Sequence, residues 1–483
     1  MKLKIFSINL RNLILLLLIS LASSQTETTK LRWAFEIFRH GARTPYSGMT
    51  SDFEDCFGHK WNGLKELTGV GLRQHFLVGY RNRIKYMEDN KLIKEQYDPR
   101  EVYIISTDSN RTIMSANAQV QGLYLPGFGP TLFKNQSDSA IPPIIMDQEM
   151  KNEILTLGDF ALPNGINVIP VHSFFTADHF IQLQDKKICP PTLEYYKKNQ
   201  ARDEVTNFLQ NMTDKYGKNL TEKLVHQEDK IDGVLKNYTK AYYIFDTIVS
   251  RNSEGIEIPK LGEYSSEEIY SDAMKFFEYD LIGNGLENDR DICLYSMSPI
   301  FNRLLQWIDL KIEKDISGDE DYTAYNLPKF VMFSAHDSTC GAFMGFMHEV
   351  FNTSMRYPYF ATNINIELYR NKSSSGNIIS KDDYYIEYII NDESMLNISY
   401  IEFNETLFKK MKTMDEVNIF CGFDKKSENI AEEEDESVYI WVDVSLGVVA
   451  VILVVIIVIT IRKKKDTNKK IENIDNLQPF NEE

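Results

Sequence analysis

Positive charge is the property that this 483-residue sequence lacks most clearly. Its 53 lysines and arginines are outnumbered by 70 aspartates and glutamates, which leaves a net charge of −17. A general nucleic-acid-binding protein normally presents a basic surface to the phosphate backbone, so this class is disfavoured. The sequence also has no internal repeat and no long low-complexity tract. Its aromatic content of 12% excludes a chain that is disordered throughout.

Histidine is scarce, and its spacing does not suggest a metal site. Six of the 8 histidines lie outside any zincin-type or zinc-finger pattern, so we infer no structural metal and expect no cofactor. One of them, His75, lies on a predicted helix, where it could line a pocket or equally be packed or exposed. The six are His59, His75, His172, His179, His226 and His348.

Cysteine is rare as well, and its distribution agrees with an exported domain. Because the number of cysteines is odd, at least one remains free or pairs with another chain. The five are Cys56, Cys189, Cys293, Cys340 and Cys421. Sequons for N-glycosylation, which predict a lumenal or extracellular glycoprotein, lie at Asn110, Asn135, Asn211, Asn219, Asn237, Asn352, Asn371, Asn397 and Asn404.

A short apolar run near the N-terminus predicts a secretory signal peptide. Lys2 and Lys4 precede the apolar run from Leu13 to Leu21, and small residues follow it up to Ser24. A positive start, a short apolar segment and small residues are the three parts of such a signal, so we place it at residues 1–24. A retained signal anchor is the alternative, but the run is short for a bilayer span.

A longer apolar segment near the C-terminus predicts a transmembrane helix over residues 439–461. At 1.5 Å per residue, about 23 residues span the roughly 30 Å of hydrocarbon. Basic residues follow at once from Arg462, and such residues prefer the cytoplasmic side. We therefore expect a cytoplasmic tail and a single-pass type I membrane protein. A buried core helix and a cleaved lipid-anchor signal are alternatives that the basic flank disfavours.

Short apolar and aromatic runs predict buried β-strands. The clearest runs occupy residues 33–38, 102–105 and 330–333, and two further candidates occupy residues 363–368 and 383–390. A helical pattern lies between the first two runs, because apolar residues recur near a spacing of 3.6 after Thr68, a candidate N-cap. They are Leu72, Phe76, Tyr80 and Ile84. The order strand, helix, strand predicts a parallel α/β sheet.

The middle of the sequence differs from the two flanking parts. It is rich in helix-forming and charged residues and lacks comparably clean strand patterns, so we expect a mainly helical insertion or cap. The predicted domains are a signal peptide (1–24), a lumenal or extracellular domain (25–423), an acidic stalk (424–438), a transmembrane helix (439–461) and a tail (462–483). Within the large domain, the core covers about 25–133 and 328–423, and the cap about 134–327.

Polar residues follow each of the three clearest strands. They are the segments 39–45 (Arg-His-Gly-Ala-Arg-Thr-Pro), 106–112 (Ser-Thr-Asp-Ser-Asn-Arg-Thr) and 334–339 (Ser-Ala-His-Asp-Ser-Thr). Ligands of open parallel sheets bind beyond the carboxyl ends of the strands. We therefore expect three arginines, two histidines and one aspartate to converge on one pocket.

Such a pocket suits phosphate-ester chemistry. Forked guanidinium donors match phosphate oxygens, and Arg111 near a helix start adds backbone N–H groups. His40 can attack phosphorus as a neutral imidazole, because the surrounding cations disfavour its protonated form. Asp337 is the natural proton donor to the leaving alkoxide if bound phosphate raises its pKa. The residues thus predict two-step hydrolysis of phosphate monoesters without a metal.

These motifs resemble the histidine acid phosphatases, in the branch of the animal prostatic and lysosomal enzymes. The resemblance rests on Arg-His-Gly-X-Arg-X-Pro at 39–45 and the later pair His336-Asp337, extends to residues 67–75 and 106–116, and fades through the middle. It implies an α/β, phosphoglycerate mutase-like parallel-sheet core with a mainly helical cap, and a homodimer as a possible state.

The resemblance also implies a role for each site residue. His40 is the residue that becomes phosphorylated, and Asp337 is the proton donor. The residues that hold the phosphate are Arg39, Arg43, Arg111 and His336. Since Asn110 belongs to the same loop, its sequon is expected to be unused.

The cysteines depart from the family pattern, which has six cysteines in three bridges. Cys189 and Cys421 lie where one family bridge would lie, so we predict that they pair. Cys340 is expected to be a buried small hydrophobe, and Cys56 and Cys293 are unassigned.

The predicted protein is a membrane-anchored acid phosphatase whose catalytic domain faces the outside or an acidic lumen. A phytase or inositol-polyphosphate phosphatase is the enzymatic alternative, which the acidic chain mildly disfavours. A non-catalytic membrane glycoprotein on the same scaffold is the other alternative. The sequence leaves the lysosomal or vacuolar membrane and the cell surface open as locations.

Overall fold

The computed structural model describes residues 29–48, 50–136, 139–173, 188–281, 291–318, 327–371 and 379–423. The predicted signal peptide, stalk, transmembrane helix and tail lie outside these residues. Across the described ranges, no helix has both the length and the apolar character that a bilayer span requires.

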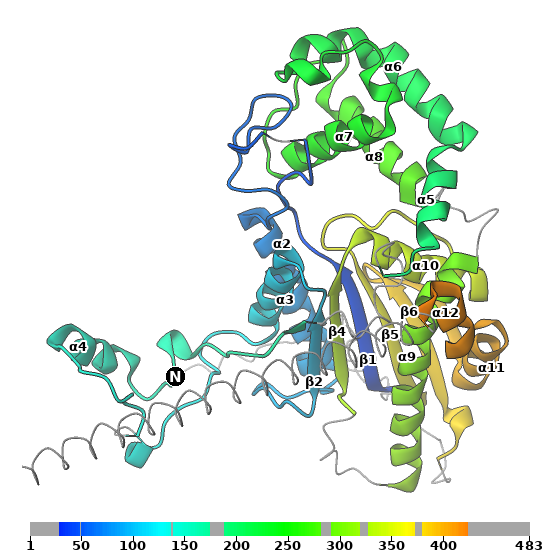
Figure 1. The fold of residues 1–483 in the computed structure, drawn as a ribbon. Coiled ribbons are helices and arrows are strands. Elements are labelled where there is room, and N and C mark those ends of the chain that lie inside the picture. Colours follow the sequence, from blue (N-terminus) through cyan, green and yellow to red (C-terminus); the bar gives the residue numbers. More distant parts are fainter. Residues whose placement is uncertain are drawn as a thin grey trace, which may run out of the picture. The chain divides into compact units, whose positions relative to one another are not determined.

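Seven strands of the described residues form one sheet, in the order β3-β2-β4-β1-β5-β6-β7 (Figure 1). All five predicted runs are strands, and two shorter or more polar strands, β3 and β7, were not predicted. The strands are β1 Thr29–Arg39, β2 Val102–Ser106, β3 His172–Ser173, β4 Phe330–Ala335, β5 Asn363–Asn371, β6 Tyr384–Ile390 and β7 Glu393–Ser399. The fold is thus of the mixed α/β class with a central sheet.

The sheet is parallel in one half and antiparallel in the other. β1, β4, β2 and β3 run parallel, whereas β5, β6 and β7 pair antiparallel. The prediction of a parallel sheet is therefore correct for four strands and wrong for three. After β4, residues 337–351 form a helix and residues 352–362 return the chain to the carboxyl edge, where Asn363 pairs with Phe38. β5 starts at that edge and must run back.

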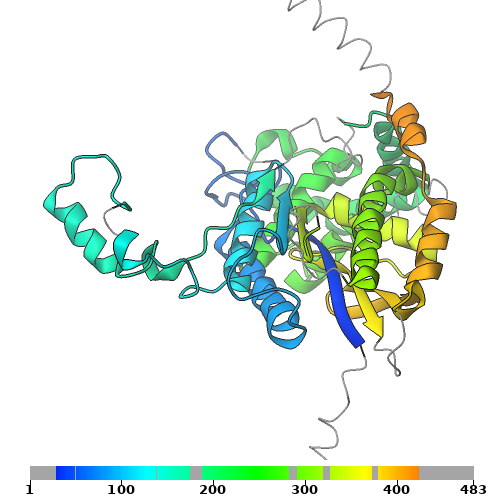
Figure 2. The same cartoon turned by 90° about the horizontal axis from the view of Figure 1, so that it is seen from below.

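Helices cover both faces of the sheet (Figures 1 and 2). One face carries α2 Gly69–Asn82, the π-helical segment η1 Arg83–Asp89 and α3 Asn110–Leu123, and the other carries α9 Asp291–Ser317, α10 Asp337–Phe351 and α11 Tyr400–Lys410. The other α-helices are α4 Gln148–Leu157, α5 Thr192–Gln200, α6 Asp203–Lys223, α7 Tyr238–Ser253, α8 Ser266–Leu281 and α12 Met414–Cys421. The 3₁₀ turns are η2 Lys134–Gln136, η3 Pro163–Gly165, η5 Gln227–Asp229, η6 Val234–Lys236 and η7 Lys381–Asp383.

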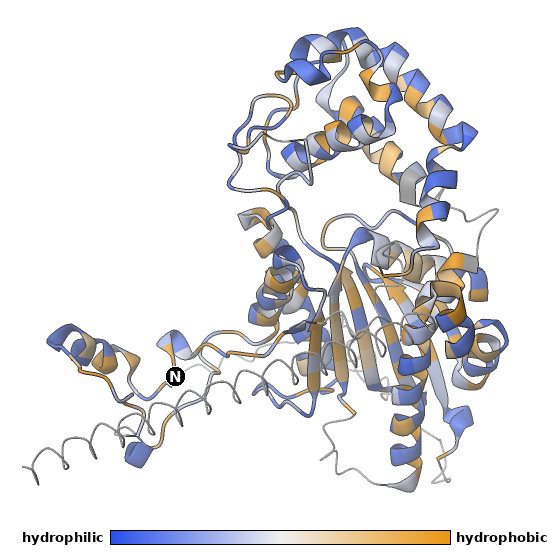
Figure 3. Ribbon diagram, in the orientation of Figure 1, coloured by the Kyte–Doolittle hydropathy of each residue, from blue (hydrophilic) through white to orange (hydrophobic). Residues whose placement is uncertain are grey.

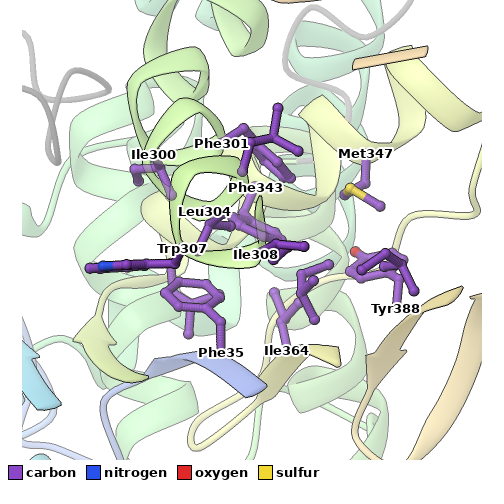
Figure 4. Close-up of a cluster of buried hydrophobic side chains, with 14 of the residues drawn as sticks. Phe35, Ile300, Phe301, Leu304, Trp307, Ile308, Phe343, Met347, Ile364 and Tyr388 are labelled. Atoms are coloured by element: carbon purple, nitrogen blue, oxygen red, sulfur yellow. The ribbon is translucent and has the colours of Figure 1, made fainter. Parts of the chain in front are cut away.

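The alternation of β1 divides the core into two layers. Phe35 packs with Trp307 of α9 and Phe343 of α10 in one layer (Figure 4), and Phe38 packs toward α2 and α3 in the other. The strands of the sheet are rich in apolar residues (Figure 3). Glu36 shares the second face with Phe38, so a carboxylate is buried between the sheet and α2–α3.

A third apolar cluster belongs to the middle of the chain. It joins α6, α7 and α8, which lie together near the carboxyl edge of the parallel strands (Figure 1). We call these three helices the helical cap. The long helix α9 also falls in the sequence range predicted as the cap, but it packs in the same cluster as the sheet.

Helix α2 begins at Gly69 and is N-capped by Thr68, as predicted, with the Thr68 hydroxyl accepting from Gly71 N–H. Its apolar stripe is partly exposed, however, and its buried face is formed by Gly71, His75, Gly79 and Asn82. Small residues are needed on this face because the backbone of α2 packs directly against the backbone of α3. A Cβ at Gly79 would lie 1.8 Å from the carbonyl oxygen of Gln119.

Candidate active site

The loop after β1 is held by backbone contacts on both sides. His40 N–H donates to the Ala335 carbonyl of β4 at 3.0 Å, and Ala361 N–H donates to the His40 carbonyl at 3.2 Å. Gly41 lies against the start of α2, where a Cβ would come within 2.5 Å of the Gly71 carbonyl oxygen. The glycine of the Arg-His-Gly motif is therefore required by close packing.

Arg39 is the buried last residue of β1. Its guanidinium forms an ion pair of 2.6 Å with Asp337 and donates to Tyr357 Oη at 3.0 Å and to the Pro358 carbonyl at 2.9 Å. The ring of Phe360 lies 4.3 Å from the guanidinium carbon. The returning loop 352–362 thus orients this arginine, a contribution that no sequence motif indicated.

The contacts of His40 leave one ring nitrogen available. Nδ1 lies 2.9 Å from the Gly41 carbonyl, which can only accept, so Nδ1 carries the proton and Nε2 keeps its lone pair. The side chain is 2% exposed. Burial lowers the pKa of His40 well below its ordinary value, and the neighbouring Arg111, Arg39 and Arg43 lower it further. The imidazole is therefore neutral, with a lone pair available on Nε2.

His336 has the opposite tautomer. Its Nδ1 accepts from Arg111 Nη2 at 3.1 Å, since a guanidinium can only donate, and its Nε2–H donates to Thr107 Oγ1 at 2.9 Å. Burial and the charge of Arg111 lower the pKa of His336 to about 3. The two imidazole rings lie edge to face with centroids 5.7 Å apart. His336 can thus donate to a ligand only after protonation or rearrangement of these contacts.

Arg43 is fixed by a residue from the helical cap. Its guanidinium donates to both carboxylate oxygens of Asp246 on α7, at 2.8 and 3.1 Å. Sequence reasoning missed Asp246, although it is the single acidic residue of α7 and lies in the apolar run Tyr242–Val249. A buried acid within an apolar helix face needs a partner. A single acid in an apolar helical segment was therefore the sequence feature that could have identified Asp246.

Asp337 begins α10 next to the arginines. Burial raises the pKa of its carboxyl, but Arg39, Arg43 and His336 outweigh burial, and the net shift is downward. Asp337 is therefore ionised in the substrate-free protein. It can hold a proton when an incoming anion competes for Arg39.

Three buried guanidinium N–H groups lack a partner. Within the described part of the chain, Nε of Arg39, Arg43 and Arg111 makes no hydrogen bond. A buried unpaired donor costs about 1–3 kcal/mol, so this cluster favours an anionic ligand. In the same ranges, no group of three or more His, Cys, Asp or Glu side chains could hold a metal ion.

The six predicted site residues therefore lie together at the carboxyl edge of the sheet. Of the described cysteines, Cys56, Cys293 and Cys340 are free, and the pairing of Cys189 with Cys421 stays a prediction. Cys340 is fully buried in the sheet core.

A neutral imidazole surrounded by guanidinium groups at this sheet edge defines a phosphate-transferring enzyme. More particularly, residues 30–391 match the family model "Histidine phosphatase superfamily (branch 2)", so the chain belongs to this superfamily.

Similar proteins agree with this family. Lysosomal acid phosphatase of Xenopus laevis is 26% identical over 368 residues, which cover 75% of this chain and 71% of that protein. The Homo sapiens enzyme of the same name is 24% identical over 356 residues, covering 72% and 70%. The apo form of Hafnia alvei phytase shares the fold, with a TM-score of 0.52, 13% identity and coverage of 82% and 99%. The predicted class, a phosphoric monoester hydrolase of the acid phosphatase kind, is confirmed.

Proposed function

We propose that the protein hydrolyses phosphate monoesters through a phosphohistidine at His40, with Asp337 as proton donor. The observation that carries the proposal is the free Nε2 lone pair of His40 beside the guanidinium groups of Arg39, Arg43 and Arg111. Arg39, Arg43, Arg111 and His336 hold the phosphate. The three guanidinium groups neutralise its charge, so the nucleophile approaches phosphorus without repulsion.

Phosphate binding prepares the acid catalyst. The phosphate competes with Asp337 for the Arg39 guanidinium and brings its own negative charge, and both effects raise the pKa of Asp337. The carboxyl then takes up a proton from acidic solvent. We therefore expect activity to be highest at acidic pH.

The reaction then proceeds in two steps. His40 Nε2 attacks phosphorus, the P–O ester bond breaks, and the leaving alkoxide takes the proton of Asp337. In the second step the Asp337 carboxylate removes a proton from water, the oxygen attacks phosphorus, and the P–N bond breaks. Alcohol and inorganic phosphate are the products, and His40 is restored.

A pulse-labelling experiment tests the proposal. The purified protein receives a ³²P-labelled phosphomonoester at about pH 5 for a few milliseconds and is quenched in alkaline denaturant, in which phosphohistidine survives. Label on the peptide that contains His40, and its loss in His40→Ala, is the expected result. An unlabelled but folded wild type would favour the alternative of a non-catalytic glycoprotein on the same scaffold.

A phytase or inositol-polyphosphate phosphatase is the second candidate, because the fold is shared with Hafnia alvei phytase. The net charge of −17 gives no long-range attraction for a polyanion. We expect higher kcat/KM for small phosphate monoesters than for phytate. The reverse ranking, measured at one ionic strength, would favour the second candidate.

The architecture around the catalytic domain is also part of the proposal. It comprises a signal peptide, a phosphoglycerate mutase-like core with helical cap (about 134–327), glycosylation, a Cys189–Cys421 bridge, and a type I transmembrane helix with the domain lumenal or extracellular. The relatives named as lysosomal support a location in the lysosomal or vacuolar membrane, and the cell surface is the alternative location. Homodimer formation is a separate element of the proposal. Protease protection, glycosidase treatment and non-reducing peptide mapping test these elements separately.

A further inference from the structure

A row of buried polar side chains lies behind the active site, between β1 and helices α2 and α3. Glu36 on β1 is completely buried, and its Oε2 accepts from Asn82 Nδ2 at 2.8 Å and from Gln119 Nε2 at 2.6 Å. Among the described residues, its Oε1 has no partner. Neither the predicted reaction nor the phosphate contacts use this carboxyl group.

His75 connects this row to the phosphate site. Its Nδ1 lies 2.9 Å from Gln119 Oε1, and its Nε2 lies 3.1 Å from the carbonyl oxygen of Arg39. The N–H groups of Arg39 and His40 are bonded to backbone carbonyls of the sheet edge. The Arg39 carbonyl, in the peptide bond that joins Arg39 to the nucleophile, is instead held by this side chain.

The direction of the hydrogen bonds depends on the proton of Glu36. An ionised Glu36 accepts from the Gln119 amide, so Gln119 oxygen faces His75 and Nδ1 must donate. A neutral His75 then turns the Nε2 lone pair toward the Arg39 carbonyl, and two acceptors face each other. This arrangement leaves the Arg39 carbonyl without its bond.

Protonation of Glu36 reverses the direction of each hydrogen bond from Glu36 through Gln119 and His75 to the Arg39 carbonyl. Its O–H donates to the Gln119 oxygen when the amide is turned end for end, an exchange that places nearly identical atoms in the same positions. The Gln119 nitrogen then donates to His75 Nδ1, and Nε2–H donates to the Arg39 carbonyl. In this direction every contact from Glu36 Oε2 through Gln119 and His75 to the Arg39 carbonyl joins a donor to an acceptor.

We propose that Glu36, Gln119 and His75 form a proton-linked row that positions the Arg39–His40 backbone when Glu36 is protonated. The inference rests on the function proposed above, and it makes His75 a positioning residue. Acidic pH would then prepare the nucleophile loop as well as the proton donor Asp337.

The surroundings of Glu36 agree with a proton held near neutral pH. Burial raises the pKa of Glu36 to about 7, although Arg81, Asn82, Gln119 and Lys85 lower it. The two cations have other carboxylate partners, since Arg81 pairs with Asp392 and Lys85 Nζ lies 2.6 Å from Glu367.

The remaining titratable neighbours do not replace Glu36 in this role. The Tyr86 hydroxyl donates to Glu367 at 2.6 Å, and its pKa is raised far above its ordinary value, so it stays protonated. Burial lowers the pKa of His75 to about 4. His75 is therefore neutral over the range in which Glu36 titrates.

The variant Glu36→Gln tests the pH link. Its side-chain amide can donate to the Gln119 oxygen at every pH, which fixes the row in the acid direction. We expect the ratio of mutant to wild-type kcat to rise about tenfold between about pH 5 and pH 8, since loss of positioning costs at least this much. The ratio cancels the effect of substrate ionisation on kcat, because this effect is the same for both proteins. A ratio that stays constant across this range would overturn the proton link.

A pair of variants tests the contact with Arg39. In His75→Gln the amide nitrogen reaches the position of Nε2 and keeps a donor for the Arg39 carbonyl, whereas in His75→Asn it reaches only the position of Nδ1. At about pH 5 we expect the glutamine variant to stay within about threefold of wild-type kcat and the asparagine variant to lose about tenfold or more. Equal losses, with kcat counted per phosphohistidine-forming site to correct for unfolded protein, would show a packing role only.

The experiment separates this proposal from the proposed function. If the wild type forms no phosphohistidine, the function itself is refuted. If the wild type does form phosphohistidine, a Glu36→Gln to wild-type kcat ratio that does not change with pH, together with equal losses of kcat in the two His75 variants, refutes only the proposed role of Glu36, Gln119 and His75.

Discussion

Arg43 and Asp246 form a buried ion pair with two hydrogen bonds that joins the candidate active site to the helical cap. The side chains are 3% and 5% exposed, and the Nη2–Oδ1 distance is 2.8 Å. Asp246 also accepts from the backbone N–H of Tyr46. Because Arg43 lies in the motif loop and Asp246 on α7, this proposed phosphate-binding residue keeps its orientation only when the cap is folded against the core.

Replacing Asp246 should therefore damage both stability and catalysis. We expect Asp246→Asn to lower the free energy of unfolding by about 3 kcal/mol, since it leaves a buried guanidinium without its counter-charge. We expect kcat/KM to fall about tenfold because Arg43 loses its orientation. Chemical denaturation and steady-state kinetics measure the two effects.

Asp229 provides a matched control for this variant. It is a buried carboxylate of η5 that accepts from Lys240 Nζ at 2.6 Å and from Tyr243 Oη at 2.9 Å, and its hydrogen bonds within the described residues do not involve the arginines of the site. Asp229→Asn should destabilise the cap but leave kcat/KM per folded molecule near the wild-type value. Similar kinetic losses in both variants would contradict a specific role for Asp246.

Gly41 is the second position where packing and catalysis meet. In Gly41→Ala the added Cβ would lie 2.5 Å from a backbone oxygen of Gly71, so the loop or α2 must shift. We expect a loss of about 2 kcal/mol in stability and at least about a hundredfold loss in kcat, because the shift moves His40. Thermal unfolding and kinetics with a small aryl phosphate test this.

A glycine inside helix α6 shows what the same change does elsewhere. At Gly217 the nearest atom to an added Cβ is a Thr213 methyl carbon at 3.5 Å, an ordinary contact. Gly217→Ala should leave kcat unchanged and stabilise the fold by up to about 1 kcal/mol, since alanine favours the helix. If Gly41→Ala behaved likewise, the close approach to α2 would not matter.

The main features of the site could be predicted because its residues follow strands with strong apolar patterns. Phe38, Ile105 and Phe333 lie near the ends of buried strands, and the carboxyl-edge rule then placed His40, Arg111 and His336 together. The antiparallel half of the sheet could not be predicted this way. It depends on where the loop after α10 returns, and a strand pattern carries no direction.

The residues that orient the site were harder to predict. Asp246, Tyr357 and Phe360 reach the arginines from segments that have no motif of their own. The periodicity located α2 but not its buried face, because backbone contact with α3 buries Gly79 and His75 rather than the larger apolar residues. Such contacts depend on tertiary approach, which composition and spacing do not encode.

The raised pKa of Glu36 has a consequence for stability that is independent of catalysis. Its ordinary value is 4.5 and its value in the fold is about 7. The folded state thus binds the proton more tightly, so stability falls as the pH rises from about 4.5 to 7. This difference corresponds to about 3 kcal/mol. We expect Glu36→Gln to be more stable than the wild type at about pH 8 by up to this amount, and to show no such advantage at about pH 4. Denaturation at both pH values checks it, and an equal difference at both would contradict a buried, titrating Glu36.

The proposed proton-donor role of Asp337 makes the sharpest prediction about the chemistry. Asp337→Asn removes the proton that the leaving alkoxide needs, and a poor leaving group needs it most. We expect kcat to fall by about 10² to 10⁴ for alkyl phosphates and much less for a nitrophenyl phosphate, whose leaving group departs as a stable anion. The variant also loses the ion pair with Arg39, an effect common to all substrates. The dependence of log kcat on leaving-group pKa therefore separates the two losses. A steeper slope in Asp337→Asn supports proton donation, whereas parallel lines would leave Asp337 with an electrostatic role toward Arg39 and assign the proton to another group.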